Sequence, residues 1–360
     1  MMRQQNNIPP SISDKIGRNL YNVPNHPIQI IKEKIFAYFS DLTKIEIENP
    51  YVTIEYNFDK LRVPQDHPSR KETDTFYKDD VEVLRTHMTC YLYPLGRSET
   101  GRSQLKYITC GDVYRKDAID ATHFPVFHQM DAFCIVDPNI DVKKDLRDKL
   151  SGLVKHLFGE KVSFKILEDS ENKDIHFPFT VDSLEIEVEL KLDNGETKLL
   201  EVLGAGTVHP DIMADLGLPS HQAWAFGLGL ERLAMILFDI PDIRLFWSTN
   251  PKFLNQFSSG EVTKFKPFSK YEMCYKDISF YLSEKFSYND LCSIVRDEDK
   301  HNIIESVTLI DEFDNKKKGI SHCYRIVYRS MESTLKNSEV DRIQNSIRER
   351  LIKELGVEVR

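Results

Sequence analysis

The sequence lacks three features that would place it in a simple class. Its six cysteines form no Cys-x-x-Cys pair, which argues against a zinc site, a redox motif or a disulfide scaffold. No apolar run reaches the roughly 18 to 20 residues that span a bilayer. An excess of basic charge is also missing, because the formal net charge is -9. We therefore expect a soluble protein with reduced thiols and no membrane contact, in which any nucleic-acid contact is a local patch.

What is present is enough for a large fold. The chain has 360 residues, of which 41% are hydrophobic, and this length indicates about two or three domains. Residues 1–24 read as a polar leader, whose charges to Asn22 are Arg3, Lys15, Arg18 and one acid, Asp14. That composition is at best a weak organelle transit peptide, so the leader does not specify the compartment.

Residues 25–247 predict one α+β domain. Pro27 stands at the first position of an amphipathic helix. Further helices are expected at 142–158 and 228–238. Strands are expected at 113–115, 126–133 and 184–190 because apolar and polar residues alternate there. The centre is predicted to be an antiparallel sheet flanked by helices.

A polar stretch at 248–267 reads as a linker, and residues 268–360 predict a second domain. Its elements follow the order strand, helix, strand, strand, helix, strand, which is the βαββαβ order of a ferredoxin-like fold. In the second helix we expect Ser338 to be the N-cap and Gly356 to end the helix.

The first segment that suggests a functional site runs from Gly111 to Gln129. It reads as a strand, a charged loop and a returning strand. Period two places Phe127, Gln129 and Asp131 on one face of the returning strand and His128 on the other. An aromatic ring beside an amide and a carboxylate would suit a nucleobase and an ammonium group. A mixed sheet face at the surface is the alternative.

The second segment, 223–235, contains the run Gly-Leu-Gly-Leu-Glu-Arg that ends at Arg232. Its glycines permit close backbone approach to a ligand, and the arginine follows at the start of a helix, where the dipole favours anions. A lone Gly-x-Gly is weak evidence. The run together with the strand pair that carries Arg115 is much stronger evidence for a binding site than the run alone. The alternative for either arginine is a surface salt bridge.

In this order the two segments resemble motifs 2 and 3 of the class II aminoacyl-tRNA synthetases. Other stretches resemble phenylalanyl-tRNA synthetase, and the tail is similar to the anticodon-binding domain of the single-chain organellar form. The stretches that carry this resemblance are 57–59, 66–70, 74–76, 84–87, 177–180, 201–206, 277–280, 290–291, 295–296 and 321–325. The resemblance covers Pro24 to Arg360.

The resemblance implies that the protein activates L-phenylalanine with ATP and transfers it to tRNA(Phe). It also implies a monomer in the mitochondrial matrix or another organelle, with Mg²⁺ bound alongside ATP. Arg115 would contact the α-phosphate and Arg232 the γ-phosphate, since a guanidinium binds phosphate oxygens bidentately. Phe127 and Arg232 would hold adenine between them, and His123 would reach the phosphates. Glu201 is the expected magnesium ligand, although a strand glutamate is often only a surface residue.

The implied sites are as follows. Catalytic residues would be Arg115, Arg232 and His123. The ATP site would comprise Arg115, Asp117, Thr122, His123, Phe124, Phe127, Glu201, Gly229 and Arg232. The phenylalanine site would comprise His87, Thr89, Cys90, Gln129, Asp131, Phe177, Phe179, Ala225 and Gly227. The tRNA-binding residues would be Lys316, Lys317, Lys318, Arg325 and Arg329.

Several alternatives stay open at this stage. Phe177 and Phe179 could be core residues, the basic tail could be a solvated helix face, and Tyr324 or Tyr328 could stack on bases or lie in the core. Asp131, Thr89 and Asp117 stand where the family often has Glu, Ser and Glu. A class II synthetase of another specificity, tyrosine included, and a catalytically inactive RNA-binding relative are the competing functions.

Overall fold

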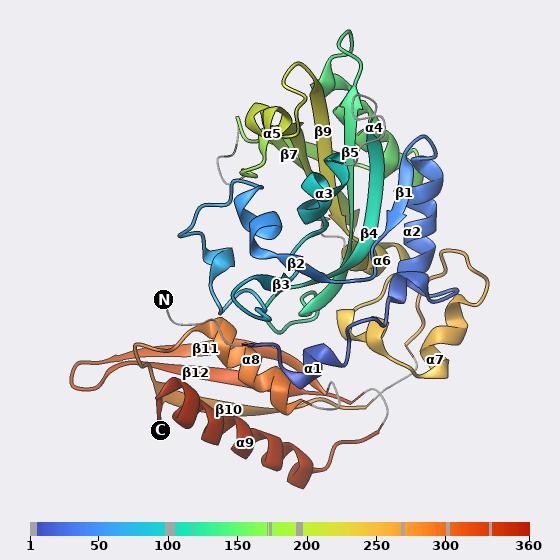
Figure 1. The fold of residues 1–360 in the computed structure, drawn as a ribbon. Helices are drawn as coiled ribbons and strands as arrows, with labels where there is room; N and C mark the ends of the chain where they lie inside the picture. The colour runs from blue at the N-terminus through green and yellow to red at the C-terminus, as the bar shows by residue number, and fades with distance from the viewer. Residues whose placement is uncertain are drawn as a thin grey trace.

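The structure is a computed structural model that describes residues 6–97, 105–116, 118–170, 172, 175–191, 197–267, 271–299, 303–330 and 333–360. It has a large seven-stranded sheet, a separate four-stranded sheet and a short two-stranded one. Figure 1 shows the four-stranded sheet with its helices lying beneath the large sheet, next to the N-terminal segment.

The large sheet has the strand order β1-β4-β5-β9-β8-β7-β6. Every neighbouring pair is antiparallel except β1 with β4 at one edge, which is parallel, so the predicted antiparallel centre of the sheet is confirmed. Its strands are β1 (Thr43–Glu46), β4 (Lys106–Tyr114), β5 (Val126–Val136), β6 (Phe164–Glu168), β7 (Thr180–Lys191), β8 (Thr197–Val208) and β9 (Gln222–Gly229).

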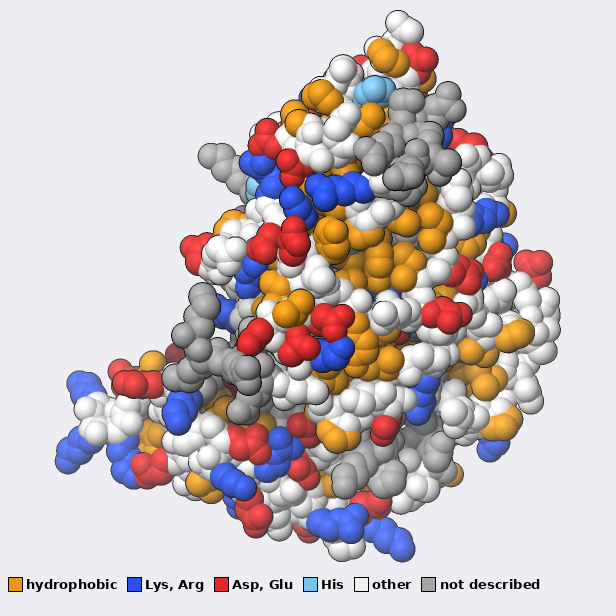
Figure 2. Space-filling view, in the orientation of Figure 1, with side chains coloured by type: hydrophobic (Ala, Val, Ile, Leu, Met, Phe, Trp, Pro, Cys, Tyr) orange, Lys and Arg blue, Asp and Glu red, His pale blue; other side chains and the backbone are white. Residues whose placement is uncertain are grey.

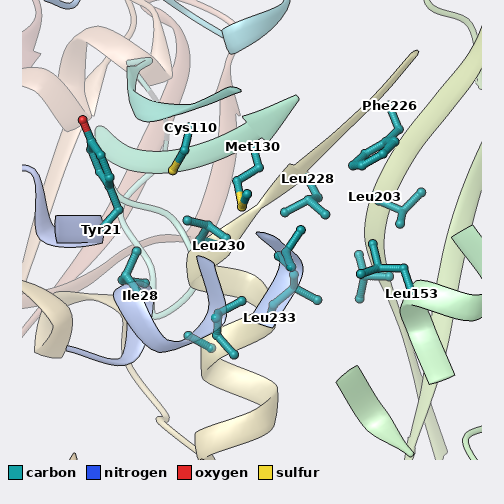
Figure 3. Close-up of a cluster of buried hydrophobic side chains, with 14 of the residues drawn as sticks. Tyr21, Ile28, Cys110, Met130, Leu153, Leu203, Phe226, Leu228, Leu230 and Leu233 are labelled. Carbon is teal, nitrogen blue, oxygen red and sulfur yellow. The ribbon is translucent and has the colours of Figure 1, made fainter. Parts of the chain in front are cut away.

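Helices cover one face of this sheet and form the main core with it. They are α2 (Pro27–Tyr38), α4 (Val142–Phe158) and α6 (Leu230–Phe238). Figure 3 shows Ile28, Leu230 and Leu233 on the helices facing Met130 and Leu228 on the strands. Pro27 begins α2 as predicted, and the His26 ring accepts a hydrogen bond from the backbone N–H of Ile28 at 3.2 Å.

The other face of the sheet carries only short elements. These are the hairpin of β2 (Tyr51–Thr53) and β3 (Glu82–Leu84), the π-turn η2 (Glu55–Asp59), the 3₁₀ turns η3 (Pro68–Arg70) and η4 (Met88–Tyr91), and helices α3 (Leu92–Gly96) and α5 (Pro210–Asp215). A second, smaller core packs here around Phe133, Tyr107 and Ala225.

The four-stranded sheet has the order β11-β12-β10-β13 and confirms the predicted ferredoxin-like connectivity. Gly356 ends the last helix in the left-handed conformation (φ 65), as predicted, whereas Ser338 lies inside that helix and Lys336 stands at its N-cap. The elements are β10 (Cys274–Tyr281), α8 (Tyr288–Glu298), β11 (Ile304–Asn315), β12 (Gly319–Tyr328), α9 (Asn337–Leu355) and β13 (Glu358–Val359).

Segments outside the two sheets connect them. Ile12 in α1 (Pro10–Ser13) and Tyr21 in η1 (Leu20–Asn22) are 2% and 0% exposed, so the polar leader contributes to the core. The loop between β4 and β5 places Ile119 in the core of the small sheet, where its carbonyl accepts from Val307 N at 3.1 Å. η6 (Ile243–Trp247), α7 (Pro251–Leu254) and η7 (Asn255–Phe257) follow the large sheet. Within the described ranges, none of the helices combines the length and apolar character that a bilayer crossing requires.

Candidate active site

Two open cavities meet at Arg115 on the uncovered face of the large sheet. The first has a volume of about 260 Å³ and the second about 230 Å³, and Arg115 lines both. The sequence-predicted residues that line the first cavity are Arg115, Thr122, His123, Phe124, Phe127, Gln129, Glu201, Gly227, Gly229 and Arg232. The predicted residues at the second are His87, Arg115 and Phe179.

Strand β5 separates its side chains between core and cavity as period two predicts. Phe127 and Gln129 line the first cavity, while His128 and Met130 are fully buried on the helix side. β5 pairs with β4 on one side and with β9 on the other, so its position in the sheet is fixed. The rigid strand therefore presents an aromatic ring and an amide toward the same space.

Arg115 follows directly after β4 and is held by backbone contacts. Its backbone N–H donates to the carbonyl of Pro125 at 3.0 Å, and its Nε donates to the carbonyl of Thr86 at 2.7 Å. The guanidinium lies 5.2 Å from the centre of the Phe127 ring. One cation thus stands between the two cavities, where it can contact ligands in both.

Arg232 stands in the first turn of α6, directly after the glycine-containing end of β9. Its Nη1 donates to Glu201, to the backbone carbonyl at 3.1 Å and to Oε2 at 3.2 Å. The pKa of Glu185 is raised, first by burial and then by the negative charges of Glu201 and Glu187. This edge of the cavity therefore combines one guanidinium with an excess of carboxylates.

The loop before β5 presents His123 through a network centred on Asp120. The carboxylate of Asp120 accepts from the backbone and hydroxyl of Thr122 and contacts Nδ1 of His123 at 2.7 Å. Burial opposes the charge of Asp120, but the hydrogen bonds from His123 and Thr122 outweigh it and lower its pKa. Phe124 stacks on Trp247 with ring centres 5.6 Å apart. Asp117, predicted near the adenine, lies outside the described residues.

Two buried ionisable groups lie near Arg115. The carboxylate of Asp131 is on β5, and the imidazole of His87 comes directly before η4. Burial raises the pKa of Asp131 to about 7, although the Thr89 hydroxyl and the Arg115 charge oppose the shift. Burial and the Arg115 charge lower the pKa of His87 to about 3. His87 Nε2 donates to the carbonyl of Asn57 at 3.0 Å, since a carbonyl can only accept.

Each of these two groups keeps one acceptor atom without a partner. Among the described residues, His87 Nδ1 and Asp131 Oδ1 are buried and have no hydrogen-bond partner. Thr89 donates its hydroxyl to the other oxygen of Asp131, and the backbone N–H of Met88 donates to Gln129 Oε1 at 3.3 Å. Buried acceptors without donors are rare in folded proteins. A ligand with N–H or O–H donors would satisfy both atoms.

Two phenylalanines lie beside the end of β8. The rings of Phe177 and Phe179 are 5.9 Å apart and inclined by 27°. A Cβ at Gly204 would lie 2.5 Å from Phe177 Cζ, and one at Gly227 would lie 2.9 Å from Asp131 Oδ1. Ala225 is paired with Phe133 and is 5% exposed. The lack of a side chain at Gly204 on β8 and at Gly227 on β9 therefore leaves the space that Phe177 and Asp131 occupy.

Cys90 has a different environment from the other predicted phenylalanine contacts. It packs in a small core cluster with Val52, Tyr77 and Val83, and its thiol donates to the carbonyl of His87 at 3.1 Å. Burial raises the pKa of this thiol. A contact between Cys90 and a substrate stays a prediction.

A buried ion pair that the sequence did not predict lies next to the site. Arg85 and Asp112 are 0% and 1% exposed, and the guanidinium of Arg85 donates to the Asp112 carboxylate and to the carbonyls of Ile47 and Asn49. The pair fixes the segment whose next residue, Thr86, accepts from Arg115. Arg85 belonged to a stretch that carried the family resemblance, so a signal was present, but nothing in the sequence gave its partner.

The small sheet carries the predicted RNA-binding residues. Lys316, Lys317 and Lys318 are exposed at the β11–β12 turn, and Figure 2 shows Lys and Arg side chains at this left tip. Arg325 pairs with Asp277 at 2.8 Å and Arg329 with Glu305 at 2.9 Å.

The aromatic residues of this sheet divide between its two faces. Tyr324 and Tyr328 are 3% and 0% exposed, so base stacking by either is excluded in this conformation. Tyr275 is 55% exposed, and the Arg325 guanidinium lies 4.0 Å from the centre of its ring. The exposed face thus offers an aromatic and guanidinium platform that the sequence analysis did not identify.

The described part of the chain contains no group of three or more His, Cys, Asp or Glu side chains arranged to hold a metal ion. His128 is fully buried, whereas His123 lies in the loop and lines the first cavity.

Family models match both parts of the chain. One described as "tRNA synthetases class II core domain (F)" matches residues 12–257, and one described as "Ferredoxin-fold anticodon binding domain" matches residues 269–360. Among solved structures, a pyrrolysyl-tRNA synthetase from Desulfitobacterium hafniense aligns with a TM-score of 0.50 at 18% identity, covering 64% of this chain and 77% of that one. This likeness concerns the fold alone.

Curated relatives are similar over nearly the whole chain. The chloroplastic/mitochondrial phenylalanine–tRNA ligase of Arabidopsis thaliana is 45% identical, covering 99% of this chain and 83% of the relative. The mitochondrial phenylalanine–tRNA ligase of Dictyostelium discoideum is 37% identical, covering 100% and 90%. That of Mus musculus is 36% identical, covering 98% and 86%.

Proposed function

The chain belongs to the phenylalanine–tRNA ligases of the class II aminoacyl-tRNA synthetase family, and we propose the following assignment of its reaction to its residues. The protein activates L-phenylalanine with ATP and transfers the phenylalanyl group to tRNA(Phe). One observation carries the assignment of the site: Arg115 stands between two open cavities and next to buried acceptors without partners.

The first cavity takes ATP. The phenylalanine carboxylate attacks the α-phosphorus, the bond to the β-phosphate oxygen breaks, and pyrophosphate leaves. Two anions must approach each other in this step, so positioned cations supply most of the catalysis. Arg115 contacts the carboxylate and the α-phosphate, because it is the cation that both cavities share. Arg232 and His123 take the outer phosphates, and Phe127 stacks on adenine.

The amino group of phenylalanine binds at Asp131 and His87. An ammonium has three N–H donors, and Asp131 Oδ1 and His87 Nδ1 are two buried acceptors that lack donors among the described residues. The low pKa of His87 keeps its ring neutral at pH 7, so Nδ1 can accept. Gln129 lies between this site and the ATP cavity. Phe177 and Phe179 hold the benzyl ring by aromatic contact.

Glu201 would hold a Mg²⁺ ion together with the phosphates of ATP. The carboxylates around Glu201 fit this role, because burial and then their mutual repulsion raise the pKa of Glu185, and a divalent cation would relieve the repulsion. When bound, Mg²⁺ neutralises phosphate charge. Glu201 would then exchange part of its contact with Arg232 for the metal.

Residues 268–360 bind the anticodon arm, with Lys316, Lys317, Lys318, Arg325 and Arg329 as the candidate contacts. We propose that residues 25–247 form the catalytic domain and 248–267 the linker. The relatives named above act in mitochondria or chloroplasts, so we propose an organellar location, and a monomer as the working state.

The test of the activation step is phenylalanine-dependent exchange of pyrophosphate into ATP. Arg115→Ala and Arg232→Ala should each lower kcat/KM by about 10²- to 10³-fold, the effect of removing a donor to developing charge. Arg115→Lys should also lower kcat/KM, because a lysine cannot bind two oxygens of the substrate bidentately as an arginine does. Arg147→Ala is the matched control, since Arg147 is an exposed arginine paired with Glu168.

The same assay separates the competing functions. A folded wild-type protein without exchange would support an RNA-binding relative, and faster exchange with another amino acid would support another specificity. Tyrosine should be activated measurably, because an apolar pocket rejects an added hydroxyl poorly. Near-normal exchange in the Arg115→Ala protein would contradict the assigned roles.

A further inference from the structure

Glu231, the residue before Arg232, reaches back from helix α6 to strand β5. It is 2% exposed, and its Oε2 accepts from the backbone N–H of His128 at 2.8 Å. Its Oε1 lies 2.5 Å from Nδ1 of His128. A carboxylate can only accept, so Nδ1 carries the proton of the imidazole. Both carboxylate oxygens therefore bind one residue of the neighbouring strand.

The carboxylate takes the place of a missing strand partner. The ladder between β5 and β9 ends at Gln129 opposite Gly229, and after Gly229 the chain turns into α6. The next residue of β5 toward the loop, His128, therefore meets the helix instead of a strand. Glu231 supplies the acceptor for its backbone N–H, so a side chain prolongs the ladder by one position.

The ring of His128 is enclosed by aromatic side chains that hold its orientation. It stacks on Trp247 with ring centres 5.8 Å apart, and Tyr21 meets it edge-on at 5.6 Å. His128 is fully buried. The ring can therefore keep its bond to Glu231 without moving, and the bond fixes where the first turn of α6 lies.

Both partners are sequence neighbours of residues in the nucleotide cavity. Phe127 and Gln129 flank His128 and point to the cavity, and Arg232 follows Glu231. We propose that Glu231 and His128 are positioning residues that set the distance between β5 and α6, and thereby the placement of Arg232 opposite Phe127 for ATP. This inference rests on the proposed function, since it concerns how that cavity holds its nucleotide.

The geometry predicts which of the two substrates binds more weakly when Glu231 is shortened. Strand β5 is held by β4 and β9, whereas the start of α6 has Gly229 at its N-cap and no capping side chain. Shortening Glu231 should therefore move the helix and Arg232 rather than the strand. Binding of phenylalanine, which depends on β5 and the η4 turn, should change little.

Pyrophosphate exchange with each substrate varied in turn tests this. Glu231→Asp should raise KM for ATP about tenfold and leave KM for phenylalanine within about twofold. His128→Asn keeps an N–H near Nδ1 and should retain a near-normal KM for ATP, whereas His128→Phe keeps the ring but loses the donor and should show the defect. Tyr328→Phe is the matched control, because it removes a buried hydrogen bond to Gln344 in the other core. It should lower Tm without changing either KM.

The outcomes distinguish a failure of the proposed function from a failure of the positioning role of Glu231 and His128. Failure of wild-type protein to exchange pyrophosphate would overturn the proposed function itself. With an active wild type, equal rises of both KM values in Glu231→Asp, or a lower Tm with an unchanged KM for ATP, would overturn the positioning role. Equal KM values for ATP in His128→Asn and His128→Phe would overturn the role of the Nδ1 bond, and His128→Asn keeps this test open if His128→Phe does not fold.

Discussion

The buried carboxyl of Asp131 should make phenylalanine binding depend on pH near neutrality. Burial raises its pKa to about 7. Only the ionised form can pair with the ammonium of phenylalanine, so kcat/KM for phenylalanine should fall as the pH falls through 7. Asp131→Asn should remove this dependence and bind phenylalanine weakly at every pH, because the amide carries no charge.

The size of the effect follows from the pKa. A group with a pKa of about 7 is ionised to about one tenth at pH 6 and to about nine tenths at pH 8, so kcat/KM should rise about tenfold over this range. The same carboxyl affects folding. Its pKa rises from 3.8 to about 7, and a shift of about 3 units corresponds to about 4 kcal/mol as an upper limit.

The sign of the stability effect is opposite to that on binding. The folded state holds the proton more tightly than the unfolded state, so the stabilising contribution is complete below pH 3.8 and is lost as the pH rises to about 7. At pH 8 the ionised carboxyl therefore destabilises the fold. Asp131→Asn should be more stable than the wild type there, by less than the upper limit, because its amide N–H₂ lacks an acceptor and costs about 1 to 3 kcal/mol.

Exchange kinetics at pH 6, 7 and 8 with saturating ATP, and urea unfolding at pH 5 and 8, measure both effects. Thr89→Val is the informative companion, since the Thr89 hydroxyl opposes the shift. Removing it should move the midpoint of the kinetic profile to higher pH. A flat profile between pH 6 and 8, or wild-type phenylalanine binding by Asp131→Asn, would refute the reasoning.

Two further substitutions test the packing around the site, and a third tests the end of helix α9. Gly204→Ala places a Cβ 2.5 Å from Phe177 Cζ, so the ring should shift into the pocket and KM for phenylalanine should rise about tenfold in exchange assays, with KM for ATP unchanged; an unchanged KM for phenylalanine would contradict this. Asp112→Ala leaves the buried guanidinium of Arg85 uncompensated and should lower the free energy of unfolding in urea by about 3 to 5 kcal/mol; a loss below about 1 kcal/mol would mean that the pair is not structural. Gly356→Ala forces a Cβ into the left-handed conformation (φ 65) and should cost about 1 kcal/mol in thermal unfolding, without changing either KM.

The architecture could largely be predicted because it depends on local patterns. The alternation around Ile186 predicted β7, and Pro27 and Gly356 marked a helix start and a helix end. The cap at Ser338 was wrong, because the helix begins one residue earlier at Asn337. The parallel edge strand β1 was missed, since strand direction depends on long-range pairing, which periodicity does not report.

The candidate site was predictable where one strand or one motif determines it. The face shared by Phe127 and Gln129 followed from period two, and Arg232 from the glycines before its helix. The partners across the sheet were not predictable. Nothing in the sequence pairs Arg85 with Asp112, and nothing shows that Asp131 is buried deeply enough to raise its pKa.

In the proposed site, the same burial that hid Asp131 and His87 from sequence reasoning would make them selective for a ligand with N–H donors. Burial moves the pKa of Asp131 up to about 7 and that of His87 down to about 3, and leaves each with an acceptor atom that has no donor among the described residues. A ligand with N–H donors can pair with such acceptors, and an ammonium group also stabilises the ionised carboxylate through its charge. We therefore propose that recognition of the amino end of the substrate comes from these two acceptors, and that the choice of side chain is left to Phe177, Phe179 and the small residues beside them.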